Sequence, residues 1–490
     1  MLEQTARAPV TRSSLGARLS DAGRSPRHRG ARRSLLLLVP LVVVLASAVF
    51  VEVSGMLPGY DGYGWVVWGH QALHLNLDTN GAPSWKPLTF LFTLPFALTG
   101  RGAVWLWMVT AVAGGFASVW FAARLAYRLT APSSGRRYAP LVAGAFAGAG
   151  VLGLDSYSQQ TLIANSDLLV VALCLAAIDC HLSKRFRLAF ILIVLAGLGR
   201  PEAWPFVGLY AAWAWRAVPS MRILAVAGVA AIPIFWFGIP GLTSKSWLRA
   251  GDLALNSPNA LHGNKIVGVI GRFDGLNVLP VQLAALCGLA LALARRDRAT
   301  LLVAAAAVLW VAIEIAFALH GWSAVPRYMY EAGAVVVVVA GTGVGRLLAT
   351  AESPRAMVRW IGPVAVVILV AALVPTARHR ERVLGRQVIG TKNNTRLLNG
   401  IPYVIARLGG ASTIKSCGKP VSFLGYQSIL GLYLDLNVGN VGYKPGREIG
   451  TGQPIVVFRP NGLGWTVRPV HIPAADRARC SSLSINVGPR

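Results

Sequence analysis

Two ionisable residues follow the first long apolar segment of the chain, each in a short polar stretch. Asp61 stands in Gly-Tyr-Asp-Gly-Tyr-Gly-Trp at 59–65, and Lys86 stands in Ser-Trp-Lys-Pro-Leu at 84–88. A carboxylate in apolar surroundings can serve as a general base toward a hydroxyl, and a lysine ammonium can hold a phosphate as a point charge. Such a pair at a membrane surface suits a reaction on a lipid phosphate. Each residue also has a structural explanation, as a turn-forming Asp and a Lys that reaches the interface from a helix end.

Two further acids border an apolar segment later in the chain. Asp155 is expected in an outer turn, and Asp167 just inside the span that follows. An acid inside the membrane is costly and is a functional candidate by default. A role in capping the helix beside Ser166 is the alternative for Asp167.

Three more charged residues are candidate ligands of a substrate. Arg200 and Glu202 flank Pro201 at the tip of a predicted bent hairpin, where they can contact a ligand or pair with each other. Proline disrupts a helix, and short interrupted segments often line a site. Arg327 is nearly alone among the basic residues of the short outer turns, which favours an anionic partner.

The composition is that of a polytopic membrane protein. The chain has 490 residues, 54% of them hydrophobic and 13% charged, and its mean hydropathy is +0.55. A soluble domain is about a quarter charged, whereas apolar blocks of about 20 residues cross a bilayer as helices. We therefore expect a mainly α protein, a transmembrane helical bundle with about 11 spans, at roughly 34–54, 101–123, 139–154, 161–180, 188–199, 203–215, 222–240, 277–294, 299–319, 331–348 and 359–376.

The basic residues orient this bundle. The net charge of +28 comes from the N-terminal tail and from short loops that all fall on one side if the N-terminus is cytoplasmic. A nucleic-acid binder would gather its basic residues on one soluble face, so we expect no nucleic-acid partner. Residues 1–33 are expected to form a disordered basic cytoplasmic tail, and 34–376 the transmembrane domain. Its outer loop 55–100 should hold two short surface helices with interfacial tryptophans.

Residues 377–490 are expected to form a small extracytoplasmic soluble domain, because short apolar runs there alternate with Gly, Pro and Asn turns. The pattern fits an α/β or a β-rich fold. Cys417 and Cys480 are the only cysteines in this region. They can pair as a disulfide if the region lies outside the cytoplasm, and free thiols are almost as plausible.

Several kinds of site are missing from the sequence. No GxxxxGK[ST] motif and no GxGxxG after a strand is present, which argues against an ATP-driven pump and a nucleotide-sugar enzyme. No His/Cys cluster has zinc spacing. No metal ligand is predicted, and dependence on a divalent metal stays open.

The first outer loop resembles that of a known family. Asp61 soon after the first span, then Trp85-Lys86-Pro87-Leu88 leading to Leu94-Pro95-Phe96, resembles the GT-C membrane glycosyltransferases, above all the aminoarabinose and protein-mannose transferases. The likeness covers about residues 34–130 well and the remainder only in topology. The family often has Glu where this chain has Gly62, and its Lys-Pro-Pro-Leu-type motif has one proline more.

The resemblance implies a function. Asp61 would be the catalytic base, Lys86 would contact the phosphate of the lipid carrier, and Asp155 would match a second-loop acid of some members. The sequence thus predicts a hexosyl- or pentosyltransferase that moves a sugar from a polyprenyl-phosphate donor to an extracytoplasmic glycan, lipid or protein. Asp61 and Asp155 are its candidate catalytic residues; its candidate substrate-binding residues are Lys86, Asp167, Arg200, Glu202 and Arg327.

Two other functions stay open. A transporter of lipid-linked sugars or small solutes would have the same helices, with repeated halves and polar residues at mid-membrane. A non-catalytic membrane scaffold that displays the C-terminal domain would leave Asp61 and Lys86 dispensable.

Overall fold

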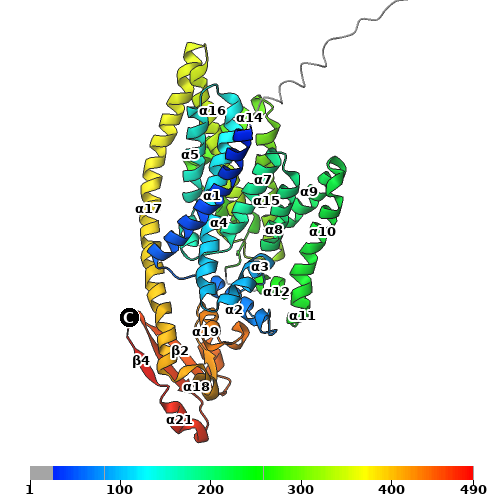
Figure 1. The fold of residues 1–490 in the computed structure, drawn as a ribbon. Helices are drawn as coiled ribbons and strands as arrows, with labels where there is room; N and C mark the ends of the chain where they lie inside the picture. The colour runs from blue at the N-terminus through cyan, green and yellow to red at the C-terminus, as the bar shows by residue number, and fades with distance from the viewer. Residues whose placement is uncertain (1–25, 82, 256, 258, 489–490) are drawn as a thin grey trace, which may run out of the picture.

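The computed structural model describes residues 26–81, 83–255, 257 and 259–488. Most of the predicted tail, residues 1–25, lies outside these ranges. The first helix, α1 (Pro26–Ser54), begins within the last part of that predicted tail. Figure 1 shows a bundle of helices along one axis, with a small sheet at one end.

Each predicted span coincides with a helix. The helices are α1, α4 (Gly102–Thr130), α5 (Tyr138–Leu152), α7 (Asp167–Leu182), α8 (Phe186–Gly199), α9 (Trp204–Ala217), α10 (Arg222–Pro233), α14 (Leu279–Ala294), α15 (Arg298–His320), α16 (Tyr330–Ala349) and α17 (Ala356–Arg407). Among the described residues, however, only 5 helices are long and apolar enough to cross a membrane, or 6 if α13 (Lys265–Asp274) and α14 form one bent span. The predicted number of about 11 is not confirmed, because several of these apolar helices are short.

Helix α16 is the core of the bundle. It packs against α4, α5, α14 and α15, and 83% of its apolar window is buried. Small residues permit this contact: a Cβ at Gly343 would lie 2.4 Å from the Ala284 carbonyl oxygen, and one at Gly288 would lie 2.4 Å from that of Val339. Without a hydrophobic driving force in lipid, close backbone packing of this kind holds helices together.

The predicted hairpin between α8 and α9 is present. Helix α8 ends at Gly199, a 3₁₀ turn spans Pro201–Ala203, and α9 follows. A Cβ at Gly199 would approach side-chain atoms of Val170 and Leu88 to 2.7 and 2.8 Å. The tip of the hairpin is therefore held against α7 and α3 (Pro87–Phe96).

The outer loop 55–100 contains the two predicted short helices, α2 (Tyr60–Leu73) and α3. The predicted interfacial position of its tryptophans is wrong, since Trp65 and Trp68 are buried. Trp65 packs edge-on against Trp107, and Trp68 against Trp85, each pair with ring centroids 5.1 Å apart. The loop is thus packed into the protein rather than laid on its surface.

The predicted boundary at residue 376 falls inside α17, which continues to Arg407 without a break although Pro375 lies in its interior. Beyond it are α18 (Gly410–Cys417), α19 (Gln427–Leu434), α20 (Pro445–Ile449) and α21 (Arg477–Ser481). A sheet has the order β1 (Lys419–Val421), β2 (Ile455–Asn461), β3 (Gly464–Val470), β4 (Ile485–Val487), with β1 and β2 parallel and the other pairs antiparallel. Of the two predicted forms, the α/β one is present.

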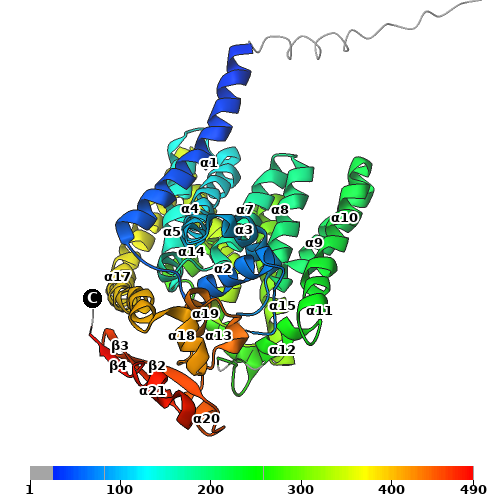
Figure 2. The same cartoon turned by 60° about the horizontal axis from the view of Figure 1, so that its bottom comes forward.

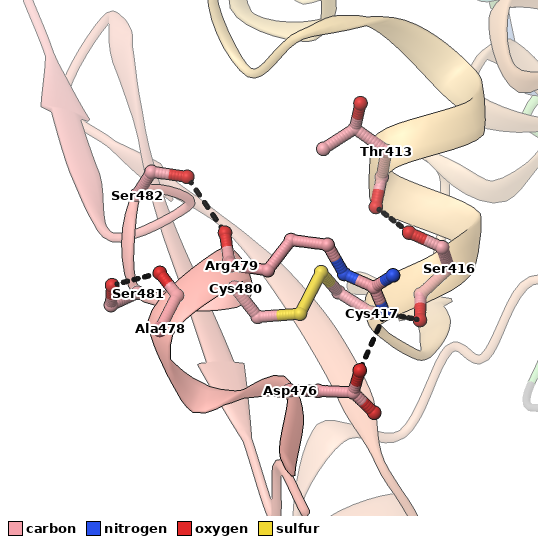
Figure 3. Close-up of a disulfide and its surroundings, with 9 residues drawn as sticks. All are labelled: Thr413, Ser416, Cys417, Asp476, Ala478, Arg479, Cys480, Ser481 and Ser482. Atoms are coloured by element: carbon pink, nitrogen blue, oxygen red, sulfur yellow. Dashed lines mark hydrogen bonds and ion pairs between the residues drawn. A yellow bond between two sulfur atoms is a disulfide. The ribbon is translucent and has the colours of Figure 1, made fainter.

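The C-terminal domain is closed by a disulfide and docked on the outer loop. Cys417 and Cys480 are bonded, with Cα atoms 5.7 Å apart, which joins α18 to α21 (Figure 3). The predicted pairing is confirmed. Helix α19 packs on α2, and Figure 2 shows the two side by side.

The crossing of α2 and α3 is a sensitive point of this arrangement. A Cβ at Gly69 would lie 2.2 Å from the backbone oxygen of Thr93, so we expect Gly69→Ala to push the helices apart and cost about 1–3 kcal/mol. A Cβ at Gly208 in α9 would meet nothing within 4 Å, and Gly208→Ala should be neutral or slightly stabilising. Thermal unfolding midpoints of the two variants in detergent micelles test this; equal midpoints would contradict it.

The arrangement also predicts an orientation. Disulfides persist in oxidising compartments, and the arginine distribution places residues 377–490 outside. Asn461 ends β2 at an exposed hairpin turn, so Asn461→Cys should react with a membrane-impermeant maleimide on intact cells. Reaction only after permeabilisation would contradict this topology.

Candidate active site

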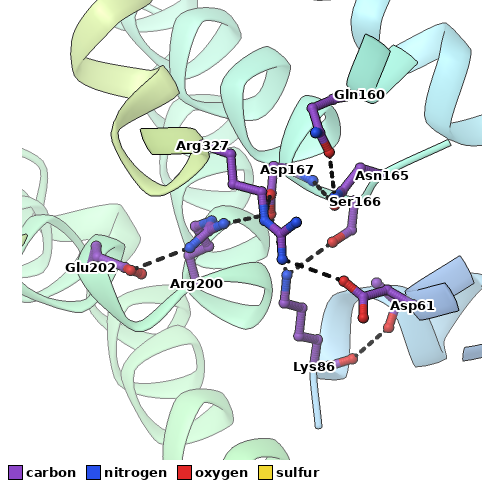
Figure 4. A network of polar contacts seen from close by, with 10 residues as sticks. Asp61, Lys86, Gln160, Asn165, Ser166, Asp167, Arg200, Glu202 and Arg327 are labelled. Atoms are coloured by element: carbon purple, nitrogen blue, oxygen red, sulfur yellow. Dashed lines mark hydrogen bonds and ion pairs between the residues drawn. The ribbon is translucent and has the colours of Figure 1, made fainter. Parts of the chain in front are cut away.

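A buried carboxylate at the start of α7 is the centre of the polar network in Figure 4. The Asp167 side chain is fully buried and is approached by three cations. Lys86 Nζ lies 3.2 Å and Arg200 Nη2 2.6 Å from Oδ1, and Arg327 Nε lies 3.3 Å from Oδ2. A buried charge needs such partners to be tolerated. Asp167 therefore gathers three of the predicted substrate-binding residues.

Each of the three cations is next to a proline. Lys86 precedes Pro87 and Arg200 precedes Pro201, and both have extended backbones with φ −139° and −148°. A residue before proline is driven out of the helical region, and proline is favoured at the first helical position. Lys86 and Arg200 are thereby each held directly before the first residue of a helical segment, α3 for Lys86 and the turn Pro201–Ala203 for Arg200. Arg327 follows Pro326 in the 3₁₀ turn Pro326–Met329 that leads into α16.

Lys86 is fixed by more than one contact. Its Nζ donates to the Ser166 hydroxyl at 3.1 Å as well as to Asp167, and it lies 5.3 Å from the centre of the Trp65 ring. The lysine is thus oriented toward the start of α7 rather than extended along the membrane surface, as the structural explanation had it. In the sequence, Ser166 was named only beside the possible capping role of Asp167. Its contact with Lys86 could not be predicted, because the two residues are 80 positions apart.

Arg200 lies behind Asp167. Its guanidinium is 4.0 Å from the centre of the Tyr328 ring, and Nη1 donates to Glu202 at 3.3 Å. Arg200 Nη2 and Arg327 Nε are in close ionic contact with Asp167. Arg200 Nε is buried and has no hydrogen-bond partner among the described residues.

Asp61 joins the network from the first turn of α2, where the helix dipole favours a carboxylate. Its Oδ2 lies 3.6 Å from Arg327 Nη2. Beside it, burial and the Asp61 charge raise the pKa of Tyr60 well above its ordinary value. The Tyr60 hydroxyl thus stays protonated next to the carboxylate.

Exposure divides the cluster into two layers. The side chains of Asp61, Lys86 and Arg327 are 28%, 17% and 33% exposed. Those of Asp167, Arg200 and Glu202 are 0%, 3% and 2% exposed. A ligand from outside would meet the first layer, and the second would hold that layer in place.

Position 62, directly after Asp61, is crowded. A Cβ there would lie 2.8 Å from Cβ of Pro58 and 3.1 Å from Nε1 of Trp107. The position after Asp61 has no room for the Glu that the family often carries. Asp61 alone therefore supplies the carboxylate that the first turn of α2 brings to the cluster.

Asp155 lies elsewhere. Its carboxylate is 45% exposed and pairs at 3.0 Å with Arg380 of α17, which also donates to the carbonyls of Gly275 and Leu276. The structure does not bring Asp155 into the cluster. Arg380 was not a candidate, because nothing in the sequence connects two residues 225 positions apart.

An apolar cavity of about 610 Å³ lies among α7, α8, α9, α15 and α16. It runs from Glu331 to the aromatic residues His181, Tyr210 and Trp213. Glu331 stands in the first turn of α16, four residues after Arg327, so one end of the cavity lies beside the turn that carries a member of the cluster. Within the described ranges, no group of three or more His, Cys, Asp or Glu side chains is placed to hold a metal ion.

Comparison with known proteins identifies the fold. No family model and no curated protein matches the sequence. The crystal structure of ArnT from Cupriavidus metallidurans bound to undecaprenyl phosphate matches with a TM-score of 0.52 and 16% identity, covering 94% of this chain and 99% of that chain. ArnT from the same organism in the apo state matches with a TM-score of 0.49 and 15% identity, over 88% and 93% of the two chains. The first match confirms the GT-C fold of the aminoarabinose transferases that the sequence resemblance implied.

The burial of Asp167 predicts unequal effects of neutralising two acids. Asp167→Asn keeps the shape but removes the negative charge 2.6 Å from the buried Arg200 guanidinium, and we expect a loss of about 3–5 kcal/mol. Asp155→Asn breaks an exposed pair and should cost about 0–1 kcal/mol. Thermal unfolding of both variants in the same micelles measures the difference. An Asp167→Asn midpoint equal to that of Asp155→Asn would show that the buried network does not support the fold.

Proposed function

We propose that this chain is a membrane glycosyltransferase that moves a hexose or pentose from a polyprenyl-phosphate donor to an extracytoplasmic acceptor. One observation carries the proposal: a carboxylate, Asp61, and two cations, Lys86 and Arg327, form the exposed layer of a single network. The fold supports it, since ArnT, crystallised with undecaprenyl phosphate, shares that fold.

The chemistry follows from these groups. The acceptor hydroxyl oxygen attacks the anomeric carbon, the bond from that carbon to the phosphate oxygen breaks, and polyprenyl phosphate leaves. Asp61 takes the hydroxyl proton. Lys86 and Arg327 stabilise the negative charge that grows on the leaving phosphate.

The resting network suggests how the donor enters. Arg327 bridges Asp61 at 3.6 Å and Asp167 at 3.3 Å. A phosphate would compete with Asp61 for Arg327, since the contact with Asp61 is the longer of the two. Asp61 would then be free to bind the acceptor hydroxyl. Arg200 and Glu202 act indirectly in this scheme, since their side chains are buried behind Asp167. A catalytic role for Asp155 rests on the family resemblance alone.

The polyprenyl tail needs an apolar path beside the phosphate. The cavity among α7, α8, α9, α15 and α16 has nearly apolar walls, and Glu331 at one end of it follows the turn that carries Arg327. We assign the first isoprene units to it. With the N-terminus cytoplasmic, this arrangement puts the transfer site at the outer face of the cell membrane.

The proposal predicts a specific loss in Asp61→Asn. The amide keeps the size of the side chain but cannot accept the proton, so transfer should fall roughly 10²–10⁴-fold. The assay follows labelled sugar from undecaprenyl-phosphate hexoses and pentoses into envelope acceptors. Asp476→Asn, on the exposed surface of the C-terminal domain, is the matched control. Full transfer by Asp61→Asn would refute the base assignment.

Lys86 should act on the donor instead. Lys86→Ala should weaken binding of undecaprenyl phosphate, and Lys86→Arg should restore part of it because the charge matters most at a point contact. Native mass spectrometry of the purified chain measures the bound lipid, with exposed Lys245→Ala as the control. Equal lipid occupancy in Lys86→Ala and Lys245→Ala would remove Lys86 from the donor site.

A further inference from the structure

We propose a second carbohydrate-binding site on the reverse face of α2, for a neutral sugar of a membrane-anchored glycan. A cavity of about 650 Å³ lies there, among the end of α1, α2, the start of α4, and α19 of the C-terminal domain. This volume is typical of small-molecule sites. Binding there requires no transfer reaction, so the inference stands apart from the function proposed above.

The geometry of α2 separates this cavity from the candidate active site. Tyr63, Val67, His70 and His74 line the cavity, and their spacing of three to four residues defines one helical stripe. Asp61 lies two positions before Tyr63 and therefore faces away, toward Arg327. One short helix thus presents different side chains to two sites.

One residue of the cavity wall, Gln71, has a hydrogen-bond donor that the described part of the chain leaves unused. Gln71 is only 8% exposed. Its Oε1 accepts a hydrogen bond from the Asp78 backbone at 3.3 Å, but Nε2 has no partner among the described residues. Leaving such a donor unpaired is unfavourable. Nε2 has almost no exposed surface, so a small turn of the Gln71 side chain toward the cavity would bring it to a ligand hydroxyl.

The other lining groups identify the class of ligand. Trp105 and Tyr433 offer aromatic surface, and Glu52 accepts a hydrogen bond from the Trp105 ring nitrogen at 2.7 Å, which fixes that ring. Aromatic rings pack against the C–H face of a sugar. Glu52 and Asp435 can accept from its hydroxyl groups, while Gln71 can donate to them.

The charge balance argues against a phosphate here. The cavity wall carries Glu52 and Asp435 and a single arginine, Arg101. His70 and His74 also line the wall, and burial lowers the pKa of His70, which favours its neutral form. Two carboxylates against one guanidinium therefore favour a neutral ligand.

Large apolar side chains are exposed near the cavity, Val53 at 82% and Leu98 at 74%, so the cavity lies next to surface suited to lipid. A glycan anchored in the outer leaflet would reach it.

The test uses the full chain in nanodiscs and two alkyl sugars, octyl β-D-glucoside and octyl β-D-mannoside, below their micelle concentrations. Equilibrium dialysis, corrected with empty nanodiscs, gives the affinity. We expect saturable binding of at least one sugar, weakened about tenfold by Gln71→Leu, which removes the amide hydrogen bond. Glu52→Gln, at an exposed position, should also weaken binding and serves if Gln71→Leu does not fold.

Two controls separate the alternatives. Trp120→Leu changes an exposed tryptophan of α4 outside the cavity and should leave the affinity unchanged. Asp61→Asn should also bind normally, since Asp61 faces the other site; lost binding would assign the sugar to the active site and overturn the inference. Three other results would also overturn the inference. The wild type could show no saturable binding, both Gln71→Leu and Glu52→Gln could bind with the wild-type affinity, or glucose 1-phosphate could bind more tightly than the alkyl sugars.

Discussion

The buried charge of Asp167 is the constraint on which the rest of the outer face depends. A carboxylate with no exposed surface must be paired, and its partners come from three separate segments: the start of α3, the break between α8 and α9, and the turn before α16. Removing one partner of such a cluster is expensive, so these segments are held in one relative position. The same contacts that satisfy Asp167 bring Lys86 and Arg327 to the surface of the cluster.

The net charge of the cluster and its distribution explain why the cluster is stable without a ligand and can still bind one. Lys86, Arg200 and Arg327 face Asp61, Asp167 and Glu202, so the six side chains are formally neutral. The balance is uneven in space, because three cations surround the buried acid, whereas Asp61 is paired with a single cation of the described residues, Arg327, at 3.6 Å. An entering anion therefore meets two partly exposed cations and displaces the weakest partner. In the proposed reaction that partner is the base, which becomes available when the donor is present.

The sequence predicted the parts of this site better than their assembly. Apolar runs located the helices, Pro201 located the hairpin break, and six of the seven chosen residues do meet. Their contacts were beyond sequence reasoning, since Lys86 and Asp167 are 81 positions apart. Those segments meet because α3 and α7 both pack on α4 and α8. Asp155 was chosen for its place in a turn, but Arg380, from a helix expected to end at 376, pairs with it. The tryptophans of α2 were misplaced because an amphipathic pattern does not show that Trp107 of α4 and Trp85 will pack on their rings.

The C-terminal domain also packs on the outer loop 55–100, which argues against a scaffold that merely displays the domain. A Cβ at Gly81, in the loop between α2 and α3, would lie 2.6 Å from the backbone nitrogen of Gly439. Asn437 also donates to Asp78 of the same loop at 3.3 Å. The loop leading to Lys86 thus lies directly against the C-terminal domain, and α19 packs on the helix that carries Asp61. A domain that was merely displayed would need only a flexible connection to the membrane. Here the C-terminal domain packs against the segment that positions Asp61 and Lys86, so its fold and its disulfide contribute to the architecture of the site.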